Sequence, residues 1–546
     1  ASNGTAVGKD CLVNNTTGTD NTAIGAAAML ANTTGGYNVA VGRSALTANT
    51  TGGYNTAIGQ NALDANTTAG GSVAVGYNAM GANTTGTNNI AIGHNAMALN
   101  TTKVHNVVIG YDAGDAMTTD EGYNVLIGSY AGGQLTTGSR ATCVGYNSGS
   151  HMTTGLTYNS AFGMATLTSC TTGANNCAIG YAALYHNTTG GENTAVGGYN
   201  TLEQNTTGSQ NCAMGSYSLT GNTTGSYNVA LGRSAMQLNT TGTFNTAVGY
   251  SALSANTEGD HNSSLGAYAL DANTTGANNT AIGYDSLSAN TTGGTNTAVG
   301  RSSLRDNTTG GYSAALGYQA GVLVTTADKE VAIGANALRY CTTGEKNTGL
   351  GYQALYNVTT GTHNTAVGHN SGYGLTTGTN NVHIGEYVRG ATTADHQVLI
   401  GSNGDFGNTS NKVAIYNGTV NANFDGSASS WTFSSDGRDK TDIVNLDLGL
   451  EFIKKIQPRK FKWNFRDEKR AATWGNGKTK AGFIAQELQA VLTETNATYT
   501  KIVNEDDPNN LTVGQSDFIP MIINAIKELS TELNSLKAEI QALKTA

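Results

Sequence analysis

The sequence predicts a mainly β protein: a long parallel β-roll or β-solenoid of coils of about 17 residues, homotrimeric, followed by a small α+β domain that ends in a coiled-coil helix. Three observations lead to this fold class. A short motif ending in A-x-G returns along three quarters of the chain, and each return carries two short apolar segments separated by turn residues. The composition then changes abruptly after about residue 430.

The repeat is visible in the stretch NTTGGYNVAVGRSALTANTTGGYNTAIGQNALDANTTAG, which runs from Asn32 to Gly70. The glycine that closes each A-x-G step returns 24 times between Gly8 and Gly401, in steps of 17 residues with occasional steps of 16 or 18. A fixed short period is typical of a solenoid, in which each unit buries its apolar residues only against its neighbours. At roughly 4.8 Å per layer, the stack predicts a rod on the order of 110 Å long.

The two apolar segments of each coil fit two short strands better than a helix. In the second coil, the segment Thr22–Gly25 predicts a strand with Ile24 in the core. Gly25 stands where the backbone turns and a Cβ would clash. Ala28 and Met29 form a second pair, one small and one large, that we expect to face the interior.

The segment Asn32–Gly35 predicts the return turn of the coil. Asn and Thr side chains bond nearby backbone groups in such turns, and Gly accepts a positive φ. The predicted core is thin, because Ala, Val, Ile and Leu fill it with few aromatic residues. A narrow coil of this kind leaves apolar surface outside, so we expect chains to associate along their length.

The repeated N-T-T triplet has other interpretations, which are weaker. It matches the acceptor pattern for N-glycosylation, but turn formation accounts for it. A ladder of Thr also resembles ice-binding solenoids, although only one of the two Thr residues can face outward flatly. The sequence lacks the G-G-x-G-x-D pattern of calcium-binding repeats.

Tyrosines recur at two positions of the coil. Stacking that stabilises the rod or the seam between chains explains them best, and a stripe that binds sugar is the alternative. The first column contains Tyr37, Tyr54, Tyr227 and Tyr312, and the second contains Tyr77, Tyr111, Tyr146, Tyr181, Tyr250, Tyr284, Tyr318 and Tyr352.

The cysteines, histidines and acidic residues of the repeats do not indicate a metal site, a cofactor site or a multi-turnover enzyme. Cys177 and Cys212 occupy the same coil position two coils apart, roughly 10 Å by layer spacing, which is too far for a disulfide. The sequence has no CxxC, which favours folding in a reducing cytoplasm. Asp112 and Asp115 look like turn residues rather than the carboxylate pair of a glycan-cleaving enzyme.

The last part of the chain has a different composition. All three Pro and all three Trp lie beyond residue 430, and residues 435–546 hold 16 of the 28 Lys and Arg together with 16 acidic residues. The sparsely charged repeats therefore carry the whole net charge of −9, which argues against a nucleic-acid partner. The sequence has no apolar run of 18 residues, so we expect no membrane insertion.

Near the C-terminus, apolar residues alternate at spacings of four and three, which predicts a coiled-coil helix over 519–544. Charged residues flank this seam, and its mixture of Leu and Ile is compatible with two or three strands. The seam consists of Ile522, Ile526, Leu529, Leu533, Leu536, Ile540 and Leu543.

Two resemblances add to this pattern. The step N-T-A-[IV]-G-x-x-A-L resembles the haemagglutinin-type repeats in the heads of trimeric autotransporter adhesins, which are β-rolls of three chains side by side; here the period is longer and very regular. The stretches SSDGRDKTDIVNLDLGLEFIKKIQPRKFKWN, which begins at Ser434, and AGFIAQEL, which begins at Ala481, resemble the C-terminal intramolecular chaperone of phage tailspikes and tail fibres, the endosialidase type.

The second resemblance implies a domain that trimerises the nascent fibre, sets its register and then often cuts itself away. Carried over to this sequence, Ser435 would be the nucleophile and Lys440 its base, with cleavage between Ser434 and Ser435. A Lys acts as a base only if burial lowers its pKa toward neutral. At most, the resemblance implies a single-turnover Ser/Lys peptidase.

The expected organisation is a repeat shaft over residues 1–401, a β-rich transition over 402–434, and a chaperone and trimerisation domain over 435–546. We expect a homotrimeric phage tail fibre or tailspike that carries host contact, folds in the host cytoplasm and is located in the virion. Its other partners would be a host glycan or protein receptor and other tail proteins. A bacterial cell-surface trimeric adhesin with the same assembly domain is the alternative.

Overall fold

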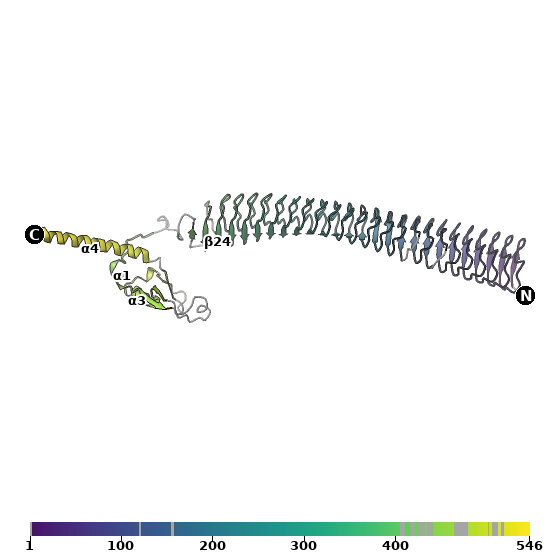
Figure 1. Cartoon of the computed structure of the whole chain (residues 1–546), viewed down its shortest axis with the longest axis horizontal. Helices are drawn as coiled ribbons and strands as arrows, with labels where there is room; N and C mark the ends of the chain where they lie inside the picture. Colours follow the sequence, from purple (N-terminus) through teal and green to yellow (C-terminus); the bar gives the residue numbers. More distant parts are fainter. Residues whose placement is uncertain are drawn as a thin grey trace. The chain divides into compact units, whose positions relative to one another are not determined.

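The computed structural model describes residues 3–118, 122–153, 158–403, 410–416, 421–424, 432–433, 441–462, 479–500, 502–504, 511–514 and 518–545. The chain divides into two compact units, residues 1–434 and residues 435–546. The first unit is a stack of similar coils, and the second is a small domain that contains the helices α1, α3 and α4 (Figure 1).

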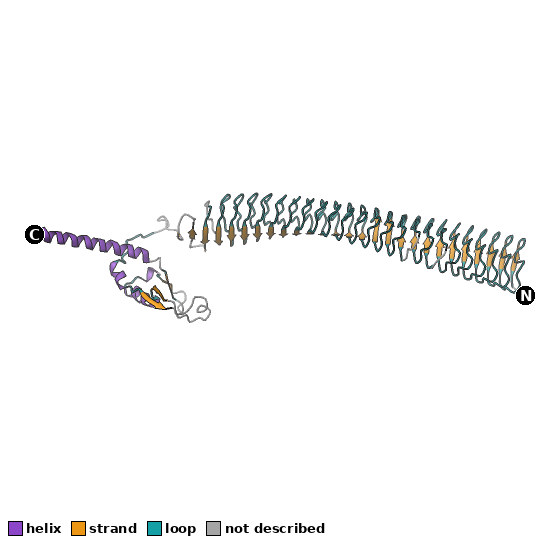
Figure 2. Cartoon of the chain, viewed as in Figure 1, coloured by secondary structure: helices purple, strands orange, loops and turns teal. Residues whose placement is uncertain are grey.

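The first unit is a parallel β-solenoid, which confirms the predicted fold of the chain, and its association into a homotrimer remains a prediction. Each coil contributes a short strand that pairs in parallel with the strand of the next coil; Thr5 lies opposite Thr22, and Thr22 lies opposite Val39. The strands form one row along the stack (Figure 2). The parallel series consists of β1 (Thr5–Val7), β2 (Thr22–Ile24), β3 (Val39–Val41), β4 (Thr56–Ile58), β5 (Val73–Val75), β6 (Ile90–Ile92), β7 (Val107–Ile109), β8 (Val125–Ile127), β9 (Thr142–Val144), β10 (Ser160–Phe162), β11 (Cys177–Tyr181), β12 (Thr194–Tyr199), β13 (Cys212–Met214), β14 (Val229–Leu231), β15 (Thr246–Val248), β16 (Ser263–Leu265), β17 (Thr280–Ile282), β18 (Thr297–Val299), β19 (Ala314–Leu316), β20 (Val331–Ile333), β21 (Thr348–Leu350), β22 (Thr365–Val367), β23 (Val382–Ile384), β24 (Val398–Gly401) and β25 (Val413–Tyr416).

Two further strands follow β25 in the same sheet. These are β26 (Asn421–Phe424) and β27 (Thr432–Phe433), and both pair antiparallel with the preceding strand. The parallel repeat therefore gives way to antiparallel pairing before the second unit begins.

The interior of the coil is built from a small residue of the strand and a pair from the following turn. Ala23, Ala28 and Met29 are all completely buried. The prediction that Ile24 lies in the core is wrong, because Ile24 is 40% exposed. Side chains alternate along a strand, so the central Ala points inward and the two residues that flank it point outward.

The second apolar segment is a turn and not a second strand. Ala27 and Met29 adopt left-handed backbone conformations, with φ of 57° and 54°. Such residues interrupt an extended chain, so the pair Ala28 and Met29 faces the core, as predicted, without forming a ladder of its own. Each coil consequently contains one strand.

Buried asparagines form a first hydrogen-bonded ladder at the return turn. The Nδ2 of Asn32 donates to Oδ1 of Asn15 (2.8 Å) and to the carbonyl oxygen of Gly35 (2.9 Å). The reason given for Gly35 is wrong: its φ is not in the left-handed region, and a Cβ there would instead clash with the carbonyl oxygen of Gly52. The side-chain amide of Asn32, which a glycan would modify in the N-T-T pattern, is buried and hydrogen-bonded in the folded coil.

A second ladder of asparagines lies just before the strands. The backbone N of Asn38 donates to Oδ1 of Asn21 (3.0 Å), and its Nδ2 donates to the carbonyl oxygen of Gly52 (2.9 Å). Gly25 has a φ of +135°, and a Cβ there would clash with the carbonyl oxygen of Gly42 in the next coil. The polar ladders and the bare glycines together let the coils stack directly on one another.

The second unit is a small α+β domain. Its core is formed by buried residues that include Leu448, Phe452, Leu488, Phe518 and Met521. Within the described residues, no helix combines the length and the apolar character needed to cross a bilayer. Its elements are α1 (Leu450–Lys455), β28 (Arg459–Lys462), β29 (Thr479–Gly482), α3 (Ala485–Glu494), η2 (Thr498–Thr500), β30 (Val503–Asn504), β31 (Thr512–Val513) and α4 (Ile519–Thr545), with β28 antiparallel to β29 and β30 antiparallel to β31.

Candidate functional site

The predicted cleavage site lies outside the described residues. This applies to the nucleophile Ser435, to the base Lys440 and to Ser434, after which the chain would be cut. The described part of the second unit begins at Thr441. The described residues of this unit therefore give information on how chains could assemble, and not on the geometry of cleavage.

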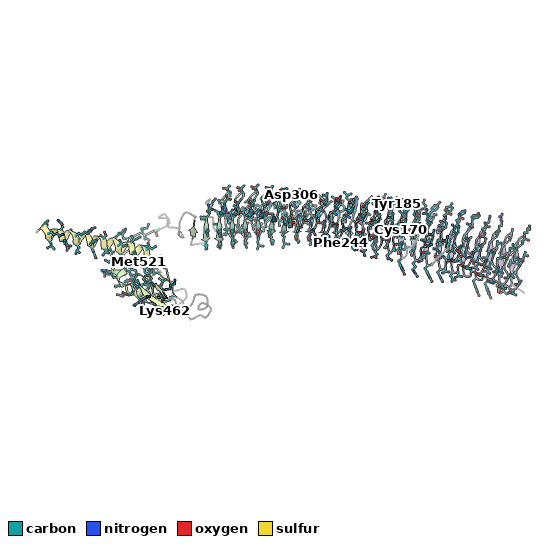
Figure 3. The ribbon with its side chains drawn as sticks, viewed as in Figure 1. Cys170, Tyr185, Phe244, Asp306, Lys462 and Met521 are labelled. Carbon is teal, nitrogen blue, oxygen red and sulfur yellow. The ribbon has the colours of Figure 1, made fainter. Side chains whose placement is uncertain are left out.

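The long helix α4 has two different faces. Met521 (Figure 3) and Ala525 are buried against the rest of the unit, at 3% and 5% exposure. The predicted seam is exposed, from 44% at Ile522 to 79% at Leu543. An apolar stripe that repeats over three heptads is stable in water only when partner helices cover it. The bounds of α4 agree with the helix predicted over 519–544. That partner helices cover its seam in a coiled coil remains a prediction.

Hydrogen bonds fix α4 to the start of α1. The Nδ2 of Asn524 donates to the carbonyl oxygens of Leu446 (3.1 Å) and Leu448 (3.2 Å). The backbone N of Leu450 donates to Oε2 of Glu528 (2.6 Å). Glu528 thus satisfies a free N–H at the N-terminus of α1, where a negative charge is favourable. The seam is consequently held in a defined orientation relative to α1.

The GFIAQEL segment contributes to the core of the unit. The ring of Phe483 stacks on that of Phe518 with centroids 4.9 Å apart, and Leu488 is buried. Glu487 accepts two hydrogen bonds from the guanidinium of Arg459, at 2.9 and 3.1 Å. Because this ion pair is exposed, it adds little to the free energy of folding, and its main effect is to link β28 to α3.

The strands of the solenoid carry a second exposed apolar surface. Val7, Ile24 and Val41 lie opposite one another in successive strands, so the outward residue after each central Ala forms one line along the coils. We call this line the aliphatic stripe. Its members that are at least 37% exposed are Val7, Ile24, Ile58, Ile92, Phe162, Ile179, Met214, Leu265, Ile282, Leu316, Leu350, Ile384, Ile400 and Ile415.

Parts of the aromatic columns stack, whereas other rings in them meet a neighbouring tyrosine edge to face. Tyr37 and Tyr54 lie 4.9 Å apart with their planes at 5°, and Tyr227 stacks on Phe244 (Figure 3) at 4.7 Å. In the second column, the imidazole of His94 stacks on its tyrosine neighbours on both sides. The stacking supports a structural role for these columns.

The thiols of the solenoid are free. Cys177 and Cys212 each pair with Thr194 in the strand between them, so they lie two coils apart. Burial raises the pKa of Cys143 to about 12 and that of Cys170 to about 11, which keeps both thiols protonated and unreactive. In the described part of the chain, no group of three or more His, Cys, Asp or Glu could hold a metal ion.

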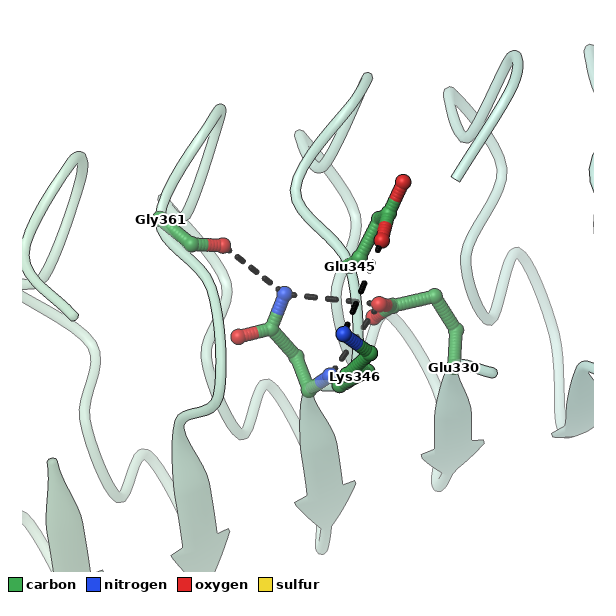
Figure 4. Close-up of polar contacts among 5 residues, drawn as sticks. Glu330, Glu345, Lys346 and Gly361 are labelled. Carbon is green, nitrogen blue, oxygen red and sulfur yellow. Dashed lines mark hydrogen bonds and ion pairs between the residues drawn. The ribbon is translucent and has the colours of Figure 1, made fainter. Parts of the chain in front are cut away.

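The sequence analysis missed several buried ionisable residues, and two of them, Glu330 and His383, have strongly shifted pKa values. Glu330 occupies an asparagine position of the second ladder, where its carboxylate accepts a hydrogen bond from the next coil (Figure 4). Burial raises its pKa to about 8. His383 replaces the central Ala of its strand, and burial lowers its pKa to about 4. Aligning the coils position by position would have revealed both, because each departs from the residue type of its column.

Comparison with known families concerns the second unit alone. Residues 435–496 match the family described as chaperone of endosialidase. No curated protein matches the chain, and no solved structure matches it. The chain thus combines a β-solenoid body with a C-terminal segment similar to the chaperone of endosialidase.

Proposed function

We propose that this protein is the subunit of a homotrimeric fibre, a phage tail fibre or tailspike, that carries contact with the host cell. The observation that carries the proposal is a segment similar to the chaperone of endosialidase, residues 435–496, in a chain whose described residues expose two apolar surfaces. These surfaces are the seam of α4 and the aliphatic stripe of the solenoid. Copies of the same chain would cover both.

The regularity of the solenoid explains the need for an assembly domain. Because successive coils are nearly identical in sequence, three chains could align out of step by 17 residues with little change in free energy. A domain that trimerises at one end of the shaft removes this degeneracy. The coiled-coil seam of α4 would supply that fixed starting point.

Self-cleavage is part of the proposal. Ser435 would attack the carbonyl of Ser434 once assembly has desolvated Lys440, since an exposed Lys keeps its ordinary pKa of about 10.4 and does not act as a base at neutral pH. Lys440 would take the hydroxyl proton and return it to the departing amine, so that the peptide bond between the two serines becomes an ester. Water would then hydrolyse this ester and separate the two parts of the chain. The reaction would occur once per chain, after folding. The chaperone segment would then be released or remain bound.

The location and partners of the fibre can be tested directly. We propose that it resides in the virion, contacts other tail proteins, and binds a glycan or protein on the host. Mass spectrometry of purified virions should detect peptides of the shaft. Detection of these peptides on bacterial surfaces, and not in virions, would favour a trimeric cell-surface adhesin.

A further inference from the structure

The first aromatic column is interrupted at several coils, and at one of them the column position has no side chain. After the stacked pair Tyr37 and Tyr54, the next residue in the column is Gly71, which has no side chain, and Asn88 follows in the coil beyond. One face of the Tyr54 ring therefore lacks the neighbour that a stacked column supplies. Tyr54 is 70% exposed, compared with 54% for Tyr37.

A groove of about 700 Å³ opens at this interruption. It is lined by Gly36, Gly53 and Gly70, which leave the backbone bare at one position of three successive coils. Thr34 and Thr51, which are exposed, also line it and present hydroxyl groups. The groove thus combines an aromatic ring with polar groups, as carbohydrate sites do.

The dimensions of the gap fit one ring. Tyr37 and Tyr54 stack at 4.9 Å, close to the layer spacing of roughly 4.8 Å, so a ring stacked on the free face of Tyr54 would occupy the layer of Gly71. A Cβ on Gly71 would lie 2.5 Å from Oδ1 of Asn88, so the end of this flexible side chain reaches into the layer and would have to shift. This oxygen consequently lies beside the same layer, where it can accept a hydrogen bond from the ring's substituents.

We infer that this groove binds a neutral oligosaccharide, with one pyranose stacked on Tyr54 in the layer of Gly71. None of the eleven residues that line the groove is charged, which favours neutral over acidic sugars. The groove extends over five coils, or roughly 19 Å by layer spacing, which accommodates a short chain of sugars parallel to the stack. The inference names the receptor class for the proposed host contact and therefore rests on the proposed function.

The test is binding of the full-length protein to an array of immobilised neutral and acidic oligosaccharides. Tyr54→Ala removes the platform. Gly71→Tyr fills the gap with a protein ring. Tyr54 itself has a φ of 61° in this column, so the backbone accepts a Tyr, and the end of the Asn88 side chain moves aside for the new Cβ. Tyr312→Ala is the matched control, since Tyr312 is 67% exposed in the same column but is followed by Lys329.

The parent and the control should bind neutral oligosaccharides equally. Both groove variants should bind at least about tenfold more weakly, which corresponds to roughly 1.4 kcal/mol, with unchanged circular dichroism. Binding to acidic glycans alone, binding that survives both groove variants, or no binding to any glycan would overturn the inference. Sedimentation of the same samples distinguishes a failure of the groove from a failure of the proposed function. A trimer that binds no sugar refutes only the groove, whereas a monomer refutes the proposed fibre.

Discussion

Replacing Glu330 by Gln should remove a pH-dependent weakness from the solenoid. One carboxylate oxygen, Oε1, accepts a hydrogen bond from the backbone N of Asn347 (3.0 Å), as the asparagine oxygen does in other coils. The other oxygen, Oε2, is buried without a partner in the described structure. Asparagine has an N–H donor at this point, and a carboxyl group has one only when it is protonated.

The size of the effect follows from the pKa of Glu330. Burial raises this pKa from 4.5 to about 8 in the folded coil, whereas the unfolded chain ionises near the ordinary value. Below pH 4.5 both states are protonated and the folded coil keeps its full stability. Between pH 4.5 and 8 the unfolded state releases its proton first, so stability falls by about 1.4 kcal/mol per pH unit, or roughly 5 kcal/mol in all.

Amide hydrogen exchange of peptides covering residues 325–350 would measure this change locally. A local readout is needed because a solenoid coil contacts only its neighbours and can open without the rest of the stack. Protection in the parent should decrease from pH 5 to pH 8 after correction for the intrinsic exchange rate. In Glu330→Gln it should stay constant, because the amide does not ionise.

Two controls sharpen the comparison. Glu345→Gln removes an exposed carboxylate whose charge is the smallest of the causes that raise the pKa of Glu330, so it should leave most of the decrease intact. Peptides covering residues 225–250, far along the stack, should show the same protection from exchange at pH 5 and pH 8 in both variants. If Glu330→Gln loses protection with pH as the parent does, or if the parent shows no loss, the reasoning about the buried carboxyl is refuted.

Three further changes test the ladder, the seam and the cleavage site. Asn239→Ala leaves a buried donor and a buried acceptor of the adjacent coils unpaired, so urea unfolding should show a loss of about 1–3 kcal/mol; an unchanged midpoint would contradict the ladder. Leu533→Glu places a charge in the exposed seam of α4 and should abolish the trimer in sedimentation velocity, while Glu532→Gln, outside the seam, should not. Ser435→Ala and Lys440→Ala should each keep the chain at its full mass after refolding, and cleavage in either variant would exclude the dyad.

The repeat was predictable because its period is read directly from Gly8 to Gly401. Which side chains of the coil point into the core was harder to infer. In the segment Thr22–Ile24 the apolar Ile suggested a core residue, but the strand is only three residues long and its single inward position belongs to Ala23. Three residues are too few to show an alternation of apolar and polar residue types, so hydrophobicity alone does not distinguish a core residue from one at an interface between chains.

The turns show a similar limit. Gly35 was assigned a positive φ, yet the left-handed residues of the coil include Ala27, Met29 and Tyr37, types that rarely adopt it. Stacking between coils overrides the local preference at these positions, because backbone bonds such as that from Tyr37 N to the carbonyl oxygen of Thr19 (2.9 Å) hold them. The gap at Gly71 depends on the same stacking, which no single coil reveals.

The central claim is that three copies of this chain assemble through the second unit. Sedimentation equilibrium of the full-length Ser435→Ala protein tests it most directly, because this variant excludes a mixture of cut and uncut chains. The account predicts a single species with three times the chain mass of 55.9 kDa, unchanged across the protein concentrations measured. A monomer or a dimer under the same conditions would contradict it.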